Sequence, residues 1–248
     1  MADYNNPVLR GQTAAVDVVD AGLRAYMLRV YNYMLVGLVL TGATAWMTAS
    51  TQFGDLFFQQ TFVNGHPAIG LNILGWVALF APLGLVIFLS ARIDAMSAAT
   101  ARLTFLIYAG IMGISLAPIL LLYTGESIAQ TFFITAGTFG AMSLWGYTTR
   151  RDLTGFGSFL FMGLIGILIA MVVNYFMKSS AMAFAISIIG VLVFTGLTAY
   201  HTQKIKEMYS VNDDGSVAGK KAIMGALRLY LDFVNLFLML LRLFGNRR

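Results

Sequence analysis

Six long stretches of this chain contain no Asp, Glu, Lys or Arg, and this feature restricts its fold more than any other. A helix that crosses the hydrocarbon core of a bilayer, about 30 Å thick, needs about 20 mostly apolar residues. Each stretch is long enough for one crossing: 30–54, 71–91, 103–125, 127–149, 153–177 and 179–200. The strands of a membrane β-barrel would instead alternate apolar and polar residues over about ten positions. The sequence therefore predicts a bundle of membrane-spanning helices.

The composition supports this prediction and argues against a soluble enzyme. Hydrophobic residues make up 58% of the 248 residues, and charged residues make up 11%. Soluble domains contain about 25% charged residues. A water-soluble fold of this size could not bury so much apolar surface.

A seventh apolar segment, 223–243, differs from the others because it carries polar side chains: Arg228, Asp232, Asn235 and Arg242. A charge at the centre of a membrane costs roughly 2.5–3.5 kcal/mol on insertion scales. We therefore expect the other helices, rather than lipid, to surround this one. The predicted fold class is an all-α integral membrane protein of seven transmembrane helices with a central, polar last helix. Residues 1–24 are predicted to be a polar cytoplasmic tail, and residues 25–248 a single transmembrane domain.

The positive charges predict the orientation, because cytoplasmic loops carry an excess of Lys and Arg. One side holds nearly all the basic residues before the last segment: Arg10, Arg24, Arg29, Arg92, Arg102, Arg150, Arg151, Lys204, Lys206, Lys220 and Lys221. The opposite loops, near 55–70, 125 and 178–180, contain only Lys178. The N-terminus should be cytoplasmic. A seventh crossing would place Arg247 and Arg248 outside, against this rule, and we favour a crossing over a segment that re-enters.

Small residues at four-residue spacing are expected to let helices pack closely in lipid. The pairs are Ala109 with Gly113, Ala136 with Gly140, and Gly137 with Ala141. Asn174 and Asn235 are expected to hydrogen-bond between helices.

Motifs of enzymes and metal sites are not found in the sequence. It contains no H-E-x-x-H zinc motif, no G-x-x-x-x-G-K-[ST] phosphate loop and no G-x-S-x-G around Ser158. There are no cysteines, and the two histidines, His66 and His201, lie far apart. The basic residues do not form the cluster that nucleic-acid binders use. We predict a protein that is not an enzyme, with no cofactor, no metal centre and no nucleic-acid partner.

Four stretches resemble the Bax-inhibitor family of membrane proteins, especially its bacterial members. They are GISLAPILLLYTG (113–125), TFFITAGTFGAMSLWGYTTRRDLTGFGSFLFMGLIGILIA (131–170), TAYHTQKIKEMY (198–209) and LYLDFVNLFLMLLRLFGNRR (229–248). The last three together are specific, and the resemblance covers most of the chain from about residue 25 onward. It implies a seven-helix fold in which six helices wrap a central last helix, in agreement with the polar seventh segment. For a bacterial member it implies the inner membrane.

The resemblance also implies a pH-sensitive calcium leak, with cell-death suppression in eukaryotic members and modulation of a membrane-bound protease in bacteria. Two aspartates on the sixth and seventh helices would share a proton-sensitive bond, and an arginine at the end of the second helix would help to close the pore. By position, the seventh-helix aspartate is Asp232 and the arginine is Arg92. The sixth-helix aspartate falls at His201, where this chain reads AYHTQ in place of the family's D-T-Q. The two-aspartate mechanism therefore does not carry over unchanged.

Asp232 is the strongest site candidate, because an ionisable residue inside a membrane helix points to function. Alternatively, Arg228, four residues earlier on the same helix face, neutralises it structurally. His201 is either a proton sensor beside Asp232 or an interfacial histidine that faces headgroups. Arg92 is a latch for Asp232, a partner of Asp94, or a residue that only sets topology. Arg228 and Asn235 are supporting candidates.

Replacing an aspartate with histidine changes the expected pH response. Two ionised carboxylates repel each other, so a shared proton makes their contact depend on pH. Histidine attracts aspartate more strongly when it is protonated, so acid should tighten the contact until Asp232 takes up a proton. We therefore expect a pH response that is weaker than, or opposite to, that of a two-aspartate relative.

Two functions of different classes follow. The first is a cation leak, of calcium or another cation, in which Asp232 and His201 form the ion pathway and pH sensor and Arg92 is the latch. Calcium prefers six to eight oxygen ligands, so one aspartate provides a passage rather than a binding cage. The second is a non-conducting protein that binds a membrane protease or another partner in the bilayer, with residues 1–24 as the contact.

Overall fold

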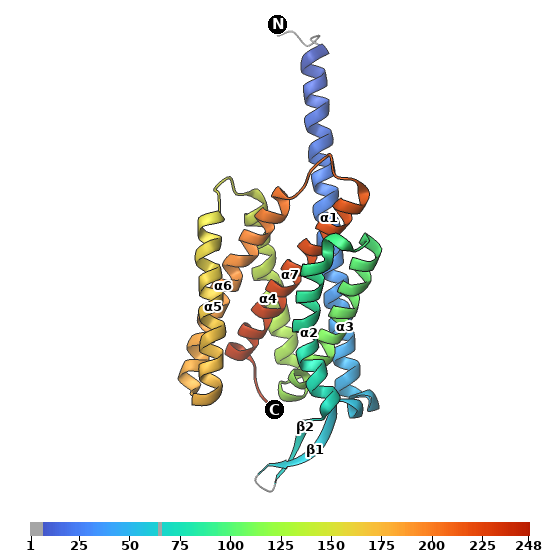
Figure 1. Cartoon of the computed structure of the whole chain (residues 1–248). Helices are drawn as coiled ribbons and strands as arrows, with labels where there is room; N and C mark the ends of the chain where they lie inside the picture. Colours follow the sequence, from blue (N-terminus) through green and yellow to red (C-terminus); the bar gives the residue numbers. More distant parts are fainter. Residues whose placement is uncertain (1–6, 64–65) are drawn as a thin grey trace.

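A computed structural model describes residues 7–63 and 66–248, and in these ranges the chain forms seven α-helices, a β-hairpin and two short 3₁₀ helices (Figure 1). The α-helices are α1 (Pro7–Ser50), α2 (Ile73–Arg92), α3 (Ala98–Leu122), α4 (Gly125–Thr148), α5 (Thr154–Met177), α6 (Ser180–Glu207) and α7 (Gly215–Phe244). All except α4 are long and apolar enough to cross a membrane. The 24-residue α4 also runs from one end of the bundle to the other. The predicted all-α membrane fold is confirmed.

Short polar side chains begin five of these helices. The residue before the helix accepts a hydrogen bond from a backbone N–H in the first turn at Asn72, Ser97, Thr124, Ser179 and Asp214. Ser, Thr, Asn and Asp are preferred there because the first N–H groups of a helix have no partner within the helix. The helix boundaries therefore follow from local chemistry.

The last helix, α7, occupies the centre of the bundle, as predicted. It packs against α1, α3, α4 and α6, whereas α2 packs mainly on α3 and α5 mainly on α6. In its most apolar window 67% of the residues are buried, compared with 17% in α5. Four neighbours rather than six therefore make most of the contact with α7, and α2 and α5 occupy outer positions.

The helix directions bring the predicted basic loops to one end of the bundle. We call this the basic end; it comprises α1 near residue 21, where its candidate span begins, the α2–α3 and α4–α5 connections, and the segment between α6 and α7 (Figure 1). The C-terminus lies at the opposite end, so α7 runs the full length of the bundle. This course agrees with the expectation that the last segment crosses the membrane rather than re-enters, and the crossing stays a prediction.

The opposite end holds a hairpin that the sequence analysis treated as a loop. Strands β1 (Phe58–Val63) and β2 (His66–Leu71) pair in antiparallel register, with Phe58 opposite Leu71, and extend beyond the helices (Figure 1). The 3₁₀ helix η1 (Gln52–Leu56) connects α1 to the hairpin, and η2 (Ile93–Ala95) follows α2. The Asn72 side chain joins the hairpin base to α2, because it donates to the Leu56 carbonyl at 2.8 Å and accepts from the Gly75 N–H at 2.9 Å.

The C-terminal residues lie against the turn between α3 and α4. The Thr124 N–H donates to the Asn246 carbonyl at 3.0 Å, and the Arg248 N–H donates to the Leu122 carbonyl at 3.0 Å. The Asn246 N–H in turn donates to Ser127 Oγ at 2.9 Å. The end of the chain is thus joined to this turn by backbone as well as side-chain hydrogen bonds.

The predicted close packing of small residues is confirmed at one position and wrong at two. A Cβ atom on Gly113 would contact the Thr41 carbonyl and lie 3.0 Å from the Ala45 N atom, so α3 closely approaches α1 there. A Cβ on Gly137 or Gly140 would meet nothing within 4 Å. These two glycines of α4 face open space instead of a neighbouring helix.

Helix α1 includes much of the predicted tail, because it begins at Pro7 and continues past residue 24 without a break. Residues 1–6, the Arg10 side chain and the His66 side chain lie outside the described part of the structure.

Candidate functional site

The strongest site candidates, Asp232 and His201, contact each other between α6 and α7. His201 Nδ1 lies 2.6 Å from Asp232 Oδ2. The Asp232 side chain is 4% exposed and the His201 side chain is 22% exposed. A buried carboxylate thus has a partially exposed, titratable partner, which is the arrangement that a proton-responsive contact requires. The prediction that these residues lie together is confirmed, while their role stays a prediction.

A hollow of about 460 Å³ opens beside His201 toward the basic end of the bundle. It is lined by residues of α5, α6 and α7: Gly157, Ser158, Phe161, Leu197, Tyr200, His201, Lys204 and Arg228. Among them, His201 is the residue whose side chain contacts Asp232. A proton or ion that enters this hollow therefore meets the imidazole before the carboxylate.

Two permanent cations, Lys204 and Arg228, line this hollow together with His201. Lys204 Nζ forms an ion pair with Glu207 at 2.7 Å, and Arg228 Nη1 points to Met208 Sδ at 3.9 Å. Neither cation forms an ion pair with Asp232. The structural alternative, in which Arg228 directly neutralises Asp232, is therefore not the arrangement observed.

Beyond Asp232, α6 and α7 pack closely against each other. A Cβ on Gly190 of α6 would lie 2.8 Å from Met239 Sδ of α7, so the methionine fills the space that the glycine leaves. Leu236, one turn after Asp232, is completely buried. The contact between His201 and Asp232 therefore has the hollow on one side and closely packed apolar side chains on the other.

Arg92, the predicted latch, lies apart from this pair. It is exposed at the end of α2, an outer helix that packs mainly on α3. It forms no ion pair with Asp232 or with Asp94, the alternative partner. Its latch role stays a prediction, without a contact in this structure that supports it.

The two asparagines bond locally rather than between neighbouring spans, so that prediction is wrong. Asn235 Nδ2 donates to the Leu231 carbonyl of its own helix at 2.8 Å. Asn174 Oδ1 accepts from the Ser179 N–H at 3.1 Å and shapes the turn from α5 to α6.

Gln203, which the sequence analysis did not select, holds the loop between α4 and α5 against α6. Its Oε1 accepts from the Leu153 N–H at 2.9 Å, and its Nε2 donates to the Arg151 carbonyl at 2.8 Å. A buried amide that satisfies both backbone groups fixes the loop position. The sequence did contain a sign of this role. Gln203 is an uncharged polar residue two positions after His201, within the stretch 198–209 that resembles the family.

A second overlooked feature is a short chain of hydroxyl groups that links three helices. The Tyr31 hydroxyl of α1 bonds to Ser143 Oγ of α4, which lies 3.0 Å from Thr202 Oγ1 of α6. Thr202 directly follows His201, so the chain holds this part of α6 in place.

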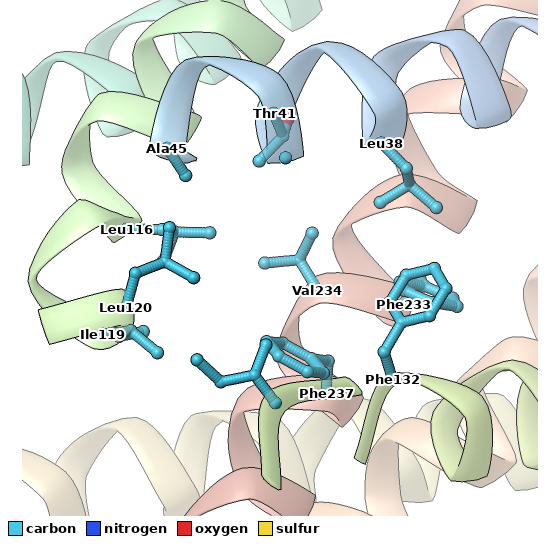
Figure 2. Close-up of a pocket in the computed structure, with 12 residues that line it drawn as sticks. Leu38, Thr41, Ala45, Leu116, Ile119, Leu120, Phe132, Phe233, Val234 and Phe237 are labelled. Atoms are coloured by element: carbon cyan, nitrogen blue, oxygen red, sulfur yellow. The ribbon is translucent and has the colours of Figure 1, made fainter. Parts of the chain in front are cut away.

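The described residues contain no group of three or more His, Asp or Glu side chains that could hold a metal ion. A further cavity of about 150 Å³ lies between α1, α3, α4 and α7, and its lining is almost entirely apolar (Figure 2). Its lining shares no residue with the hollow at His201. Neither space has the carboxylate-rich oxygen shell that calcium prefers.

Comparisons with known proteins agree with the sequence resemblance. The sequence pattern of the family described as "Inhibitor of apoptosis-promoting Bax1" matches residues 23–248. The chain is 52% identical over 230 residues to the inner membrane protein YbhL of Escherichia coli (strain K12), covering 92% of this chain and 94% of YbhL. It is 48% identical over 249 residues to a protein of Rickettsia prowazekii (strain Madrid E), covering 100% of both chains. A protein of Caulobacter vibrioides is 44% identical over 252 residues, again with 100% of both chains covered.

Proposed function

Because the chain belongs to the Bax-inhibitor family of membrane proteins, we propose that it is a slow, proton-controlled cation leak, with calcium as the leading substrate. The observation that carries the proposal is the buried Asp232 of the central helix, 2.6 Å from the partially exposed His201. Ionisable residues at membrane depth mark ion and proton pathways. The proposal assigns no catalytic chemistry to the chain.

The pH response follows from the charges around the pair. Histidine changes its charge between about pH 5 and 8. Protonation would turn the contact with Asp232 into an ion pair and add a cation to a hollow that already holds Arg228 and Lys204, the latter paired with Glu207. Both effects oppose cation entry, so flux should fall as the pH drops through the histidine range. At still lower pH, protonation of Asp232 would end the attraction.

The leak should be slow, because the closed packing beyond Asp232 must loosen before an ion passes. Met239 fills the space beside Gly190, and Leu236 is completely buried. Coordination by one carboxylate, backbone carbonyls and water fits transient passage better than tight calcium binding.

We also propose that the chain lies in a bacterial inner membrane with its N-terminus in the cytoplasm. The name of YbhL places that relative in the inner membrane. The basic end of this chain includes Arg24, Arg92 and Arg150, and cytoplasmic loops carry an excess of such residues.

A second candidate function is that of a non-conducting interaction protein, which binds a membrane protease or another partner in the bilayer. The observation that favours it is the length of α1, because the helix begins at Pro7 and projects beyond the other helices at the basic end (Figure 1). A projecting helix offers a surface for a partner.

Reconstitution into liposomes that contain a calcium indicator tests the leak. Wild type should pass more calcium at pH 8 than at pH 6. Asp232→Asn should reduce flux about tenfold or more, since a loss of about 1.4 kcal/mol of attraction at a barrier corresponds to tenfold in rate. His201→Gln should remove the difference between pH 6 and pH 8, because an amide does not titrate there. Asp94→Asn, a matched substitution of an exposed carboxylate at the basic end, should behave as wild type.

Equal calcium uptake by wild-type and protein-free liposomes at both pH values would reject the leak. In that case the interaction function is tested by deleting residues 1–20 and measuring whether a membrane protease still co-purifies with the chain.

A further inference from the structure

Helices α1 and α4 both pack on α7 but leave a groove of about 750 Å³ between them. Its floor includes the buried side chains of Met27, Met34, Phe139 and Phe233. Exposed leucines of both helices form its rims: Leu28, Leu35 and Leu144. The groove therefore opens sideways, among side chains that face the hydrocarbon core.

The dimensions of this groove fit one leaflet of a bilayer. On α1 its lining runs from Arg24 to Leu38, which is about 21 Å of helix axis at about 1.5 Å per residue. Half of a hydrocarbon core is about 15 Å thick. The lining thus extends from the basic end, at headgroup level, to the middle of the membrane.

At its inner end the groove adjoins the apolar cavity of about 150 Å³ shown in Figure 2. The two spaces share Leu38, Phe132 and Phe233. Side chains of four helices point into this inner cavity. It continues the groove toward the end of the bundle opposite the basic end.

Positive charge gathers at the end of the groove that lies at headgroup level. Arg24 lines the groove and forms no ion pair in the described part of the chain. Lys206 of α6 donates to the carbonyl of Tyr147, another lining residue, at 2.9 Å, and its Nζ lies 5.1 Å from the centre of the Tyr147 ring. At this end Arg24 thus lines the groove directly, and Lys206 adds a second cation beside the lining residue Tyr147.

We propose that the groove between α1 and α4 is a binding site for an anionic phospholipid, whose phosphate lies near Arg24 and Lys206 and whose acyl chain lies over Phe139 and Phe233. The basic residues at headgroup level and the apolar floor below them match the two ends of such a lipid.

Open space beside Gly140, a lining residue, permits a direct test. A Cβ on Gly140 or on Gly137 meets nothing within 4 Å, but Gly137 does not line the groove. Gly140→Phe therefore fills the groove, and Gly137→Phe is its matched control on the same helix. Gly140→Leu is a smaller filling variant, in case the phenylalanine variant does not fold. Arg29→Gln, an exposed arginine that does not line the groove, is the control for Arg24→Gln.

Native mass spectrometry of the whole protein, released from nanodiscs of equal parts phosphatidylglycerol and phosphatidylcholine, measures the bound lipid. Wild type and Gly137→Phe should each retain one phosphatidylglycerol. Each methylene of an acyl chain changes affinity about fourfold, so excluding two of them in Gly140→Phe or Gly140→Leu should lower retention by about fifteenfold. Arg24→Gln should reduce the preference for phosphatidylglycerol about fivefold, because one basic residue near an anionic surface contributes about that factor. Arg29→Gln should keep the wild-type preference.

Three results would overturn the proposal. The first is equal lipid retention by the Gly140 variants and Gly137→Phe. The second is a lipid-free dimer that dissociates in Gly140→Phe, since the occupant would then be a second copy of the chain. The third is a preference for phosphatidylglycerol over phosphatidylcholine that is the same in Arg24→Gln as in wild type. That result would show that Arg24 does not bind an anionic headgroup.

Discussion

The hydroxyl groups of Thr41 and Tyr230 lie 2.7 Å apart, where α1 and α7 meet α3. Two carbonyls can accept the Thr41 hydroxyl hydrogen, that of Ala109 in α3 at 2.8 Å and that of Gly37 in α1 at 2.9 Å. In both cases Tyr230 is the donor to Thr41 Oγ1. Both side chains are buried, with exposed fractions of 6% and 0%. One hydroxyl of α1 thus lies within hydrogen-bonding distance of both the central helix and α3.

Thr41→Val should therefore destabilise the bundle. It leaves the Tyr230 hydroxyl without this partner, and polar contacts between membrane helices contribute about 0.6 kcal/mol on average and up to about 1.7 kcal/mol. We expect a loss of about 1 kcal/mol, measured as a lower thermal midpoint in a fixed detergent. Thr104→Val is the control, because Thr104 bonds only to the Thr100 carbonyl of its own helix. Equal midpoints for the two variants would contradict the prediction.

The glycines of α3 and α4 should respond differently to added side chains. Gly113→Leu must push α1 and α3 apart, because its Cβ would already contact the Thr41 carbonyl. Overpacking of this kind costs about 1–3 kcal/mol. Gly137→Ala should be neutral or stabilising by up to about 1 kcal/mol, because alanine favours helix and the position is open. Thermal midpoints measured side by side test this difference, and a larger loss for Gly137→Ala would refute it.

Gln203→Leu should release the loop between α4 and α5. The change leaves the Leu153 N–H and the Arg151 carbonyl without the two hydrogen bonds that Gln203 provides. Each such loss costs about 1–3 kcal/mol for a buried group. Trypsin should then cleave after Arg150 or Arg151 several-fold faster than in wild type. Gln130→Leu, at an exposed position of α4, should not change the rate.

Asp152, in the same loop, should show a pKa below the ordinary aspartate value. Its carboxylate accepts hydrogen bonds from the Thr154 hydroxyl at 2.6 Å and the Thr154 N–H at 2.8 Å, and both lower the pKa. Because the pKa of Asp152 is lower in the folded protein, its ionised carboxylate stabilises the fold at pH values above the ordinary aspartate pKa of about 3.9. This stabilisation is lost as the pH falls through the lowered pKa of the folded protein.

Thr154→Val removes the hydroxyl donor and should raise the pKa of Asp152 toward its ordinary value. A carboxyl carbon NMR titration in micelles measures the change, with Asp152→Asn to assign the signal. An unchanged pKa in Thr154→Val would show that the hydroxyl is not the main cause.

The sequence predicted the spans well because insertion into lipid depends on local composition. Each of the predicted spans corresponds to one helix, and Asp232 marked α7 as the central helix before any contact was known. A charged residue facing hydrocarbon is costly, so polarity within a span indicates which helix the others surround. The same reasoning, together with the family resemblance, left two places for His201, beside Asp232 or facing the headgroups.

Other features could not be predicted, because they depend on which helix faces which. Gly113 and Gly137 look alike in sequence, yet one touches α1 and the other faces open space. Arg92 looked like a partner for Asp232, but α2 packs on α3 and leaves it exposed. The hairpin at 58–71 gave no clear signal, because its strands are short and lie between two long apolar segments.

The amino-acid sequence alone determined that this chain is a bundle of membrane helices with a polar helix at its centre, because the cost of placing charge in lipid acts on each segment separately. Only the tertiary structure decided that His201 meets Asp232 directly, that Gln203 holds a loop, and that α1 and α4 leave a groove. These outcomes depend on the rotation and spacing of neighbouring helices, which are set by the packing of many side chains at once.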